Sequence, residues 1–264
     1  MGAILLKQGV AQWSQWGRGS QAGLAALAAA AALAAQTLPL TARAAEDTDT
    51  PGAGRWEINI GASTVHRAGG WDRSLPDSDV NYGLGERLQL MAALPYVTLR
   101  EHGAPSHSGW GSASAGVKWR VADQDALGVD LAVFPRFSWN PSSNTARRGL
   151  GSPGRSLLLP LIAGRRFGDS AWYAELGRNL VENGPHEWQA GLKLLRQCLP
   201  QLECRVELEH SRVPRDGGQT TVSAGAKWRL GEQFILQGSA GRDVAGGREG
   251  RRRLVLYLGL QLLL

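Results

Sequence analysis

The chain has 264 residues, a formal net charge of +6, 20% charged residues and 35 glycines. It is too polar for a helical membrane protein, which needs uninterrupted apolar runs of about 20 residues. The charge is small and forms no basic stripe with interleaved aromatic residues, so we expect no nucleic-acid partner.

Residues 1–44 have the pattern of a secretory signal peptide. Lys7 and Arg18 precede a short, Ala-rich apolar run, and small residues surround a cleavage site after Ala44. An N-terminal membrane anchor is the alternative, but the run is short for a membrane span. Cleavage removes three basic residues and lowers the formal charge from +6 to +3. Residues 45–54 are acidic, contain Pro and Gly, and are expected to form a flexible periplasmic lead-in.

One stretch occurs twice: residues 114–121 (SAGVKWRV) recur as residues 223–230 (SAGAKWRL). In both copies small and apolar residues alternate with polar or cationic ones. Strict alternation over ten or more residues predicts a long β-strand with one apolar and one polar face. A strand of about 9–11 residues with Trp near its end is typical of a membrane-spanning barrel.

Alternating segments continue to the C-terminus. We predict twelve strands at residues 55–65, 78–84, 87–100, 110–121, 127–139, 155–166, 170–181, 186–195, 203–211, 219–230, 233–242 and 251–264. Short connections (84–86, 167–169, 231–232) alternate with longer ones (66–77, 101–109, 140–154, 243–250). An even strand number with short periplasmic turns and longer outer loops is the rule for outer-membrane barrels. The fold class is therefore all-β: a twelve-stranded antiparallel transmembrane barrel over residues 55–264.

Large aromatic residues gather near strand ends on the apolar faces. Amphipathic rings prefer the lipid headgroup level, so this placement predicts two aromatic girdles. The expected periplasmic girdle contains Trp56, Trp119, Trp172, Trp228 and Phe234. The expected outer girdle contains Tyr96, Trp139 and Trp188.

The two cysteines of the chain, Cys198 and Cys204, flank a predicted periplasmic turn. A disulfide fits an exported protein in an oxidising compartment, and two free thiols are the alternative. The final strand carries Leu at every even position from 254 to 264. It resembles the C-terminal strand that outer-membrane proteins present to the barrel assembly machinery, although it ends in Leu264 instead of an aromatic residue.

Several stretches resemble a family of outer-membrane proteins that are labelled as transporters and associated with meta-pathway phenol degradation. The resemblance lies in residues 79–90 (DVNYGLGERLQL), 94–97 (LPYV), 116–120 (GVKWR), 158–161 (LLPL) and 224–229 (AGAKWR). It covers almost all of the mature chain. It implies passage of a small solute across the outer membrane and no catalytic residues.

The polar faces supply candidate lumen residues. The cationic ones are Lys118, Arg120, Arg136, Lys227 and Arg229, and the acidic ones are Glu175, Glu187, Glu207 and Glu209. One hypothesis is a positive constriction at the periplasmic mouth that selects or holds anionic solutes. The family resemblance adds aromatic solutes as a candidate class. The alternative is that these cations pair with the carboxylates and close the lumen.

Other functions have weaker support in the sequence. His210 and Ser211 are adjacent on a strand and point to opposite faces, so they do not form the dyad that a lipid hydrolase needs. We expect no enzyme activity, no cofactor and no metal site. A third possibility is a structural barrel whose loops bind a partner. Its longest loop, residues 140–154, with Arg155 beside it, is suited to anionic lipopolysaccharide.

Arg178 departs from the pattern because it takes the lipid-facing parity of its strand near mid-depth. Exposure there costs about 2–4 kcal/mol. A bulge at Gly177 that returns Arg178 to the lumen is one solution.

Overall fold

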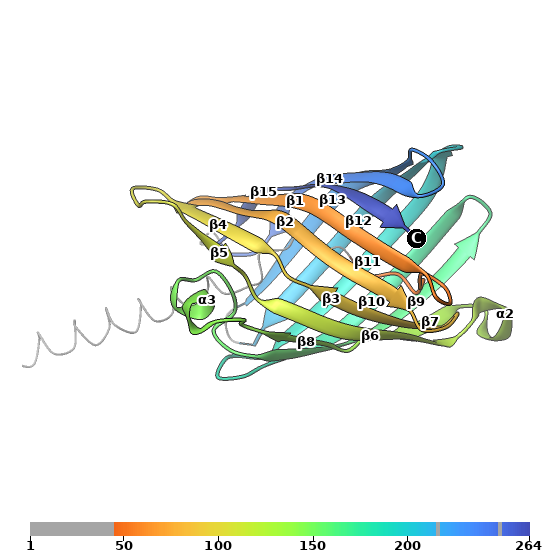
Figure 1. The fold of residues 1–264 in the computed structure, drawn as a ribbon, viewed down its shortest axis with the longest axis horizontal. Coiled ribbons are helices and arrows are strands. Elements are labelled where there is room, and N and C mark those ends of the chain that lie inside the picture. Colours follow the sequence, from red (N-terminus) through yellow and green to blue (C-terminus); the bar gives the residue numbers. More distant parts are fainter. Residues whose placement is uncertain (1–44, 215–216, 248–249) are drawn as a thin grey trace, which may run out of the picture. The chain divides into compact units, whose positions relative to one another are not determined.

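The computed structural model describes residues 45–214, 217–247 and 250–264. Within them, fifteen strand segments form one antiparallel sheet, and the pairing of β1 with both β15 and β2 closes it into a barrel (Figure 1). The signal peptide and the cleavage site after Ala44, which the sequence predicts, lie outside these residues.

Most strands run uninterrupted for 12 to 14 residues. They are β1 (Trp56–Arg67), β2 (Gly70–Gly83), β9 (Ser156–Phe167), β10 (Ser170–Val181), β11 (Glu187–Leu199), β12 (Leu202–Val213), β13 (Gly217–Arg229), β14 (Phe234–Ala245) and β15 (Arg252–Leu263). Two helices of one turn interrupt the connections: α2 (Gln124–Leu127) and α3 (Ser143–Arg147). No helix among the described residues is long and apolar enough to cross a membrane.

Three barrel strands are each broken into two segments. They are β3 with β4 (Leu88–Ala93 and Tyr96–Glu101), β5 with β6 (His107–Trp110 and Ala113–Ala122), and β7 with β8 (Asp130–Val133 and Arg136–Trp139). Two of the breaks contain Pro95 and Pro135, which have no N–H group to donate to a ladder. Their carbonyl oxygens still accept bonds, from Gly111 (2.9 Å) and Val117 (3.1 Å). Counting each broken pair once, the twelve-stranded barrel predicted from the sequence is confirmed.

The largest error in the predicted strand boundaries is at the start of the second strand. Residues 66–77 were expected to form a long outer loop, but β2 begins at Gly70 and continues the ladder with β1 almost from the turn. The register shifts by one residue between Gly61 and Ser63, opposite the Leu75–Pro76 pair. This irregularity breaks the alternation, which is why the first half of the strand gives no period-two signal.

The two ends of the barrel differ. The C-terminus, α2 and the turns that join β9 to β10 and β11 to β12 lie at one end (Figure 1). The other end carries α3, the longer β4–β5 and β8–β9 connections and the short β1–β2 turn. By the rule that periplasmic turns are short and outer loops are long, we refer to these as the periplasmic and outer ends.

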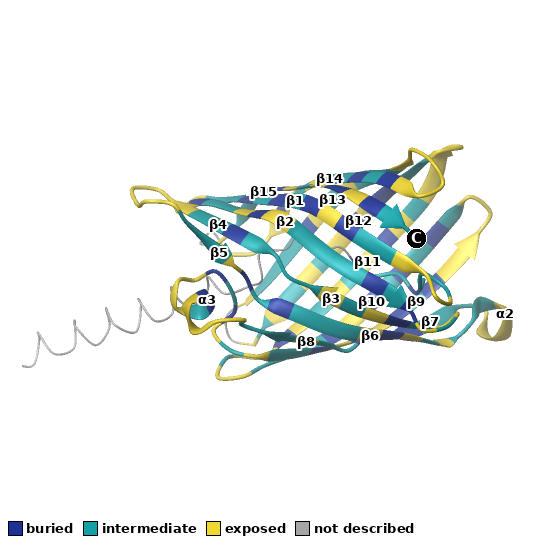
Figure 2. Cartoon of the chain, in the orientation of Figure 1, coloured by how far each residue is buried: buried dark blue, intermediate teal, exposed yellow. Residues whose placement is uncertain are grey.

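Burial alternates along most strands (Figure 2). Most exposed residues in the middle of the outer face are apolar. Exposed members from around the ring are Ile60, Leu90, Val117, Leu161, Leu176, Leu192, Val206, Val222 and Leu258. The interior instead buries Asn59, Asn81, Gln89, Lys118, Glu175, Lys193, Glu207 and Gln237. A water-soluble barrel has the opposite distribution, with the apolar faces packed inside. The outer face of this barrel is therefore built to contact hydrocarbon.

Predicted girdle residues lie on this outer face. Trp56, Trp119, Trp188, Trp228 and Phe234 are exposed there. Tyr96 packs edge-on against Trp110 with 5.3 Å between ring centroids, and Trp139 stacks on Phe137 at 5.9 Å. Trp172 is the third residue of β10 and pairs with Arg165 of β9.

Arg178 remains on the outer face, and no bulge at Gly177 turns it inward. The β9–β10 and β10–β11 ladders run through this point without a register shift. Arg178 lies three residues before the outer end of β10, not at mid-depth, and its guanidinium carbon is 4.8 Å from the centroid of the Trp188 ring. The predicted bulge was therefore wrong, and the outer girdle accommodates the charge.

The predicted disulfide is present between Cys198 and Cys204, with Cα atoms 5.9 Å apart. The two cysteines lie in β11 and β12, on either side of the tight turn at Pro200–Gln201. The crosslink therefore joins neighbouring strands next to their hairpin turn, at the periplasmic end.

Candidate functional site

The interior of the barrel contains a cavity of about 1040 Å³. Its wall carries side chains of both charges, and part of its lining comes from residues 45–53, which precede the first strand. We call residues 45–50 the lead-in segment. The sequence predicted a flexible stretch outside the barrel here, but the segment contacts the inner wall at several points.

The lead-in segment contacts opposite parts of the wall. The Glu46 backbone N–H donates to Glu175 Oε2 at 3.0 Å, and the Thr50 hydroxyl donates to the Glu86 carbonyl at 2.9 Å. Ala45 and Thr48 are buried, at 4% and 0% exposure. The segment is thus held by specific contacts inside the lumen.

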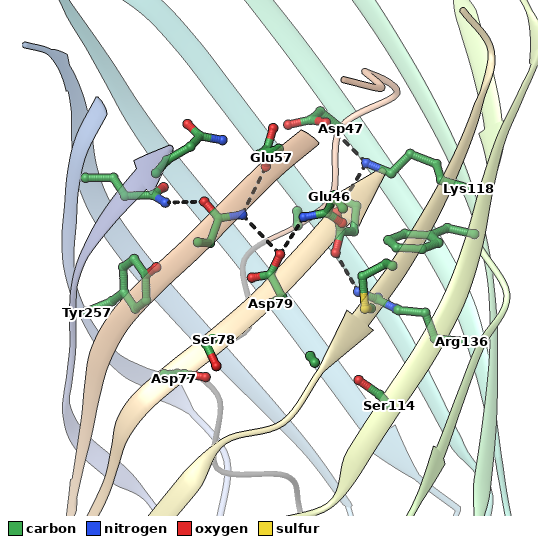
Figure 3. Close-up of a pocket in the computed structure, with 18 of the residues that line it drawn as sticks. Glu46, Asp47, Glu57, Asp77, Ser78, Asp79, Ser114, Lys118, Arg136 and Tyr257 are labelled. Atoms are coloured by element: carbon green, nitrogen blue, oxygen red, sulfur yellow. Dashed lines mark hydrogen bonds and ion pairs between the residues drawn. The ribbon is translucent and has the colours of Figure 1, made fainter. Parts of the chain in front are cut away.

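Acidic side chains of the lead-in segment meet cations of the wall (Figure 3). Lys118 Nζ lies 3.5 Å from the Glu46 carboxylate and 3.4 Å from that of Asp47. Arg136 pairs with Glu46, and Lys193 Nζ lies 3.2 Å from Asp47. We call Lys118, Arg136 and Lys193 the cationic group. Buried cations need partners of opposite charge, and the lead-in segment provides them.

These contacts shift the acidity of the lead-in carboxyls. Burial alone would raise the pKa of Glu46, but Arg136 and Lys118 outweigh it and lower the pKa. For Asp47, Lys193 and Lys118 likewise outweigh burial and hold the pKa well below its ordinary value. Burial, reinforced by the charge of Asp47, raises the pKa of Asp49 even though Arg166 pairs with it. The docked segment therefore keeps Glu46 and Asp47 ionised.

Two glycines let the lead-in segment and the adjoining Gly52 approach the wall closely. A Cβ at Gly191 would lie 2.8 Å from the Ala45 Cβ, and a Cβ at Gly83 would overlap the Gly52 carbonyl. Glycine is the residue that allows such close approach of two backbones. The wall is thus shaped to receive this segment.

An apolar surface adjoins the cationic group. Phe134, Ala132 and Ile162 are almost fully buried and pack against Met91. The Phe134 ring lies between two cations, with Lys118 Nζ 5.1 Å and the Arg136 guanidinium carbon 4.7 Å from its centroid. Positive charge and apolar surface therefore lie side by side in the cavity.

The wall formed by β1, β2, β3 and β14 carries an amide and carboxylate network. Asn59 donates to Asp79 at 3.0 Å and accepts from Gln237 at 3.1 Å, and Gln89 donates to Asn81 at 2.6 Å. Figure 3 shows Asp79 and Tyr257 apart from Lys118 and Arg136. The lumen is thus polarised, with positive charge on one part of its wall and acceptor groups on another.

The predicted lumen residues fall into separate clusters. Lys118, Arg136 and Glu175 come together, with 3.9 Å between Arg136 and Glu175. Arg120 pairs with Asp123 at 3.0 Å, and Glu207 lies 3.6 Å from Arg205. The remaining members are placed as follows: Lys227, Arg229 and Glu209 line the cavity, and Glu187 is buried on β11. Lys118, Arg120, Lys227 and Arg229, the cations of the predicted constriction, thus line the same cavity.

Sequence reasoning missed several members of this site. Lys193 shares the polar parity of β11 with Glu187, so the alternation itself could have identified it. Glu46, Asp47 and Asp49 have no periodic context, and an acidic segment outside any strand gives no signal of its destination. Phe134 was overlooked because it lies at a strand break.

His210 and Ser211 are the one pair that the sequence raised as a possible dyad. His210 takes the outward parity of β12, and its ring contacts the Thr220 hydroxyl at 2.9 Å. Ser211, the next residue, takes the inward parity, so the two side chains do not form a dyad. No group of three or more His, Cys, Asp or Glu side chains in this part of the chain is arranged to hold a metal ion.

Fold and site together define a closed β-barrel with an apolar exterior and a polar, partly filled lumen. No family model matches the chain, and no curated protein matches it either. Among solved structures, it is similar to an outer membrane channel from Pseudomonas putida F1, with a TM-score of 0.60 and 16% identity over 84% of this chain and 100% of that one. It is also similar to the NanC porin (TM-score 0.55, 7% identity, 78% and 98% covered) and the KdgM porin (TM-score 0.52, 10% identity, 78% and 98% covered). At these identities the likeness establishes the fold.

Proposed function

We propose that this chain is an outer-membrane channel for small anionic solutes with an apolar portion, and that the lead-in segment occupies the solute position. The observation that carries the proposal is the pairing of Lys118, Arg136 and Lys193 with Glu46 and Asp47. These acids belong to a segment that is not part of the barrel wall.

Exchange explains how a solute enters. Exposing the cationic group without a counter-charge is costly, but replacing one carboxylate by another conserves the pairing. A solute carboxylate that reaches Lys118 and Lys193 takes over the contacts of Asp47. Release of the segment also takes Glu46 from Arg136 and Asp49 from Arg166. Arg136 keeps Glu175 at 3.9 Å, and further anions entering from solution compensate the remaining charge.

The apolar portion of the solute has its own surface. Phe134 and Met91 line the cavity beside the cationic group. Phe134 is 2% exposed with the lead-in segment docked, so its ring becomes a surface for a solute ring or short chain once the segment has left. The resemblance to proteins associated with phenol degradation makes aromatic acids the first solutes to test. The proposal includes export with cleavage after Ala44 and insertion by the barrel assembly machinery.

The experiment is a measurement of ion selectivity in planar bilayers. In a KCl gradient, the wild-type protein is expected to prefer chloride, and Lys118→Gln/Lys193→Gln is expected to lose most of that preference. Arg165→Gln is the control because Arg165 is exposed on the outer face and pairs with Trp172 across the β9–β10 ladder.

Liposome swelling tests the solute class. Benzoate is expected to enter faster than glucose or benzylamine in the wild type, and the double variant is expected to reduce benzoate entry alone. A folded barrel that passes no current and no solute overturns the proposal in favour of a structural or loop-binding barrel. Unchanged selectivity in the double variant removes the role of the cationic group.

A further inference from the structure

A basic and aromatic cluster lies on the outer face of the barrel at its outer end. Trp188 of β11 is paired with Arg178 of β10 on one side and with Arg212 of β12 on the other. All three take the outward parity of their strands, and Trp188 and Arg212 are exposed. We call Arg178, Trp188 and Arg212 the outer-face cluster.

The charge of this cluster is not balanced by the strands that carry it. Every carboxylate on β10, β11 and β12 takes the inward parity: Glu175, Glu187, Glu203, Glu207 and Glu209. At this end of the barrel, Glu182 follows β10 but is bonded to Arg155. The outer face of these three strands is therefore purely cationic at this level.

Arg178 lacks a hydrogen-bond acceptor within the described part of the chain. Its guanidinium carbon lies over the Trp188 ring, 4.8 Å from the ring centroid, and its Nη1 is buried without a partner. A cation–π contact satisfies none of the guanidinium N–H groups. An arginine with an unpartnered guanidinium nitrogen suits a phosphate group, which can accept two parallel hydrogen bonds from a planar guanidinium.

Apolar side chains continue from the cluster toward mid-depth. Leu176 follows Arg178 on the outer face of β10, and Leu192 and Leu208 take the same face of β11 and β12. All three are exposed, at 56%, 40% and 43%. A ligand that fills this face needs a phosphate at one end and acyl chains at the other.

We propose that Arg178, Trp188 and Arg212 bind a phosphate of lipid A, a phosphorylated and acylated glycolipid, in the outer leaflet. The proposal rests on the outer-membrane placement given above but not on the passage of solutes. Trp188 holds Arg178 at the headgroup level, Arg212 contributes the second cation, and the leucines contact the acyl chains.

The barrel also carries a matched control. At the periplasmic end, Arg165 of β9 is paired with Trp172 of β10, and Arg196 of β11 is exposed on the same outer face. Arg165→Gln/Arg196→Gln therefore removes the same charge, including an arginine beside a tryptophan, from the end that faces the inner leaflet.

Native mass spectrometry of the detergent-solubilised full chain tests the proposal. The wild type is incubated with bisphosphorylated lipid A, with dephosphorylated lipid A, and with inorganic phosphate. We expect binding of bisphosphorylated lipid A, which Arg178→Gln/Arg212→Gln weakens by about tenfold. The control variant is expected to bind as the wild type does, and Arg178→Lys/Arg212→Lys is expected to recover part of the affinity because it restores charge without the planar fork.

Each other outcome overturns the proposal. Equal binding of the dephosphorylated lipid shows that the phosphate is not recognised. An equal loss of lipid A affinity in the control variant shows that net positive charge alone is responsible. Displacement of lipid A by inorganic phosphate at the same concentration shows that the cluster binds free anions. Heat-modifiable gel mobility confirms that each variant is folded, and bilayer conductance measured in parallel keeps this result separate from the channel proposal.

Discussion

The Lys193 ammonium lies 3.2 Å from the carboxylate of Asp47, which precedes it by 146 residues. This contact joins the inner wall of the barrel to a segment that precedes the first strand. Because Lys118 also contacts Asp47 at 3.4 Å, the same carboxylate bridges β6 and β11 across the lumen. The lead-in segment therefore supplies counter-charge to the interior.

A larger residue at position 191 should displace the lead-in segment. Gly191→Leu places atoms where Ala45 now lies, since even a Cβ would come within 2.8 Å of it. We expect the channel conductance to rise about twofold or more as the lumen widens. A second readout is maleimide labelling of Thr48→Cys, a position with 0% exposure in the docked segment. Labelling should be slow in the parent and fast in the Gly191→Leu background.

Gly231→Leu is the control for this experiment, because a Cβ at position 231 meets no atom within 4 Å. It should change neither conductance nor labelling. Slow labelling in folded Gly191→Leu protein would show that Gly191 does not control the docking of the segment.

Docking of the lead-in segment should depend on pH in a defined direction. Glu46 and Asp47 have lowered pKa values when the segment is docked. Their contribution to the free energy of docking is therefore fully present above the ordinary pKa values of 4.5 and 3.8, and it is lost as the pH falls through the lowered pKa values. Asp49, with its raised pKa, acts in the opposite sense and offsets part of the change. We expect conductance to stay constant from about pH 7 to about pH 5 and to rise only below about pH 4.

Current recordings across this range test the sign. Glu46→Gln/Asp47→Asn should be more conductive already at neutral pH and should lose the acid response. A wild-type conductance that rises between neutral pH and about pH 5 would contradict the assignment of these two carboxyls.

The outer end of the barrel contains a buried carboxylate that should matter for stability. Asp243 is 1% exposed, accepts from the Thr221 hydroxyl at 2.7 Å and pairs with Arg252 at 3.1 Å. Asp243→Ala leaves Arg252 without this partner, and we expect a loss of roughly 2–4 kcal/mol in unfolding free energy. Urea titration in detergent micelles measures it. Asp125→Ala, at an exposed position of α2, should change stability by less than about 0.5 kcal/mol.

The outer face could be predicted from the sequence because it repeats locally. In β15 every second residue from Leu254 to Leu264 is leucine, and the pairing with β1 and β14 keeps these residues on one side. Strand breaks at Pro95 and Pro135 were harder to predict, because the apolar and polar parities continue across them. The early start of β2 was missed since its irregularity near Leu75–Pro76 interrupts the alternation.

The filled lumen could not be predicted by the same reasoning. The contacts of Glu46 and Asp47 with Arg136 and Lys193 span 90 and 146 residues, and no periodic pattern connects such positions. Arg178 shows the reverse case: its outward parity was read correctly, and only its depth beside Trp188 required the structure.

Spin-label accessibility in lipid bilayers tests most directly whether the apolar outer face contacts hydrocarbon. Labels are attached at Leu258→Cys on the outer face of β15 and at Gln261→Cys on its inner face. Lipid-soluble oxygen should relax the label at position 258, and a water-soluble nickel chelate should relax the label at position 261. Efficient relaxation by the nickel chelate at position 258, with oxygen favouring position 261, would contradict the transmembrane barrel.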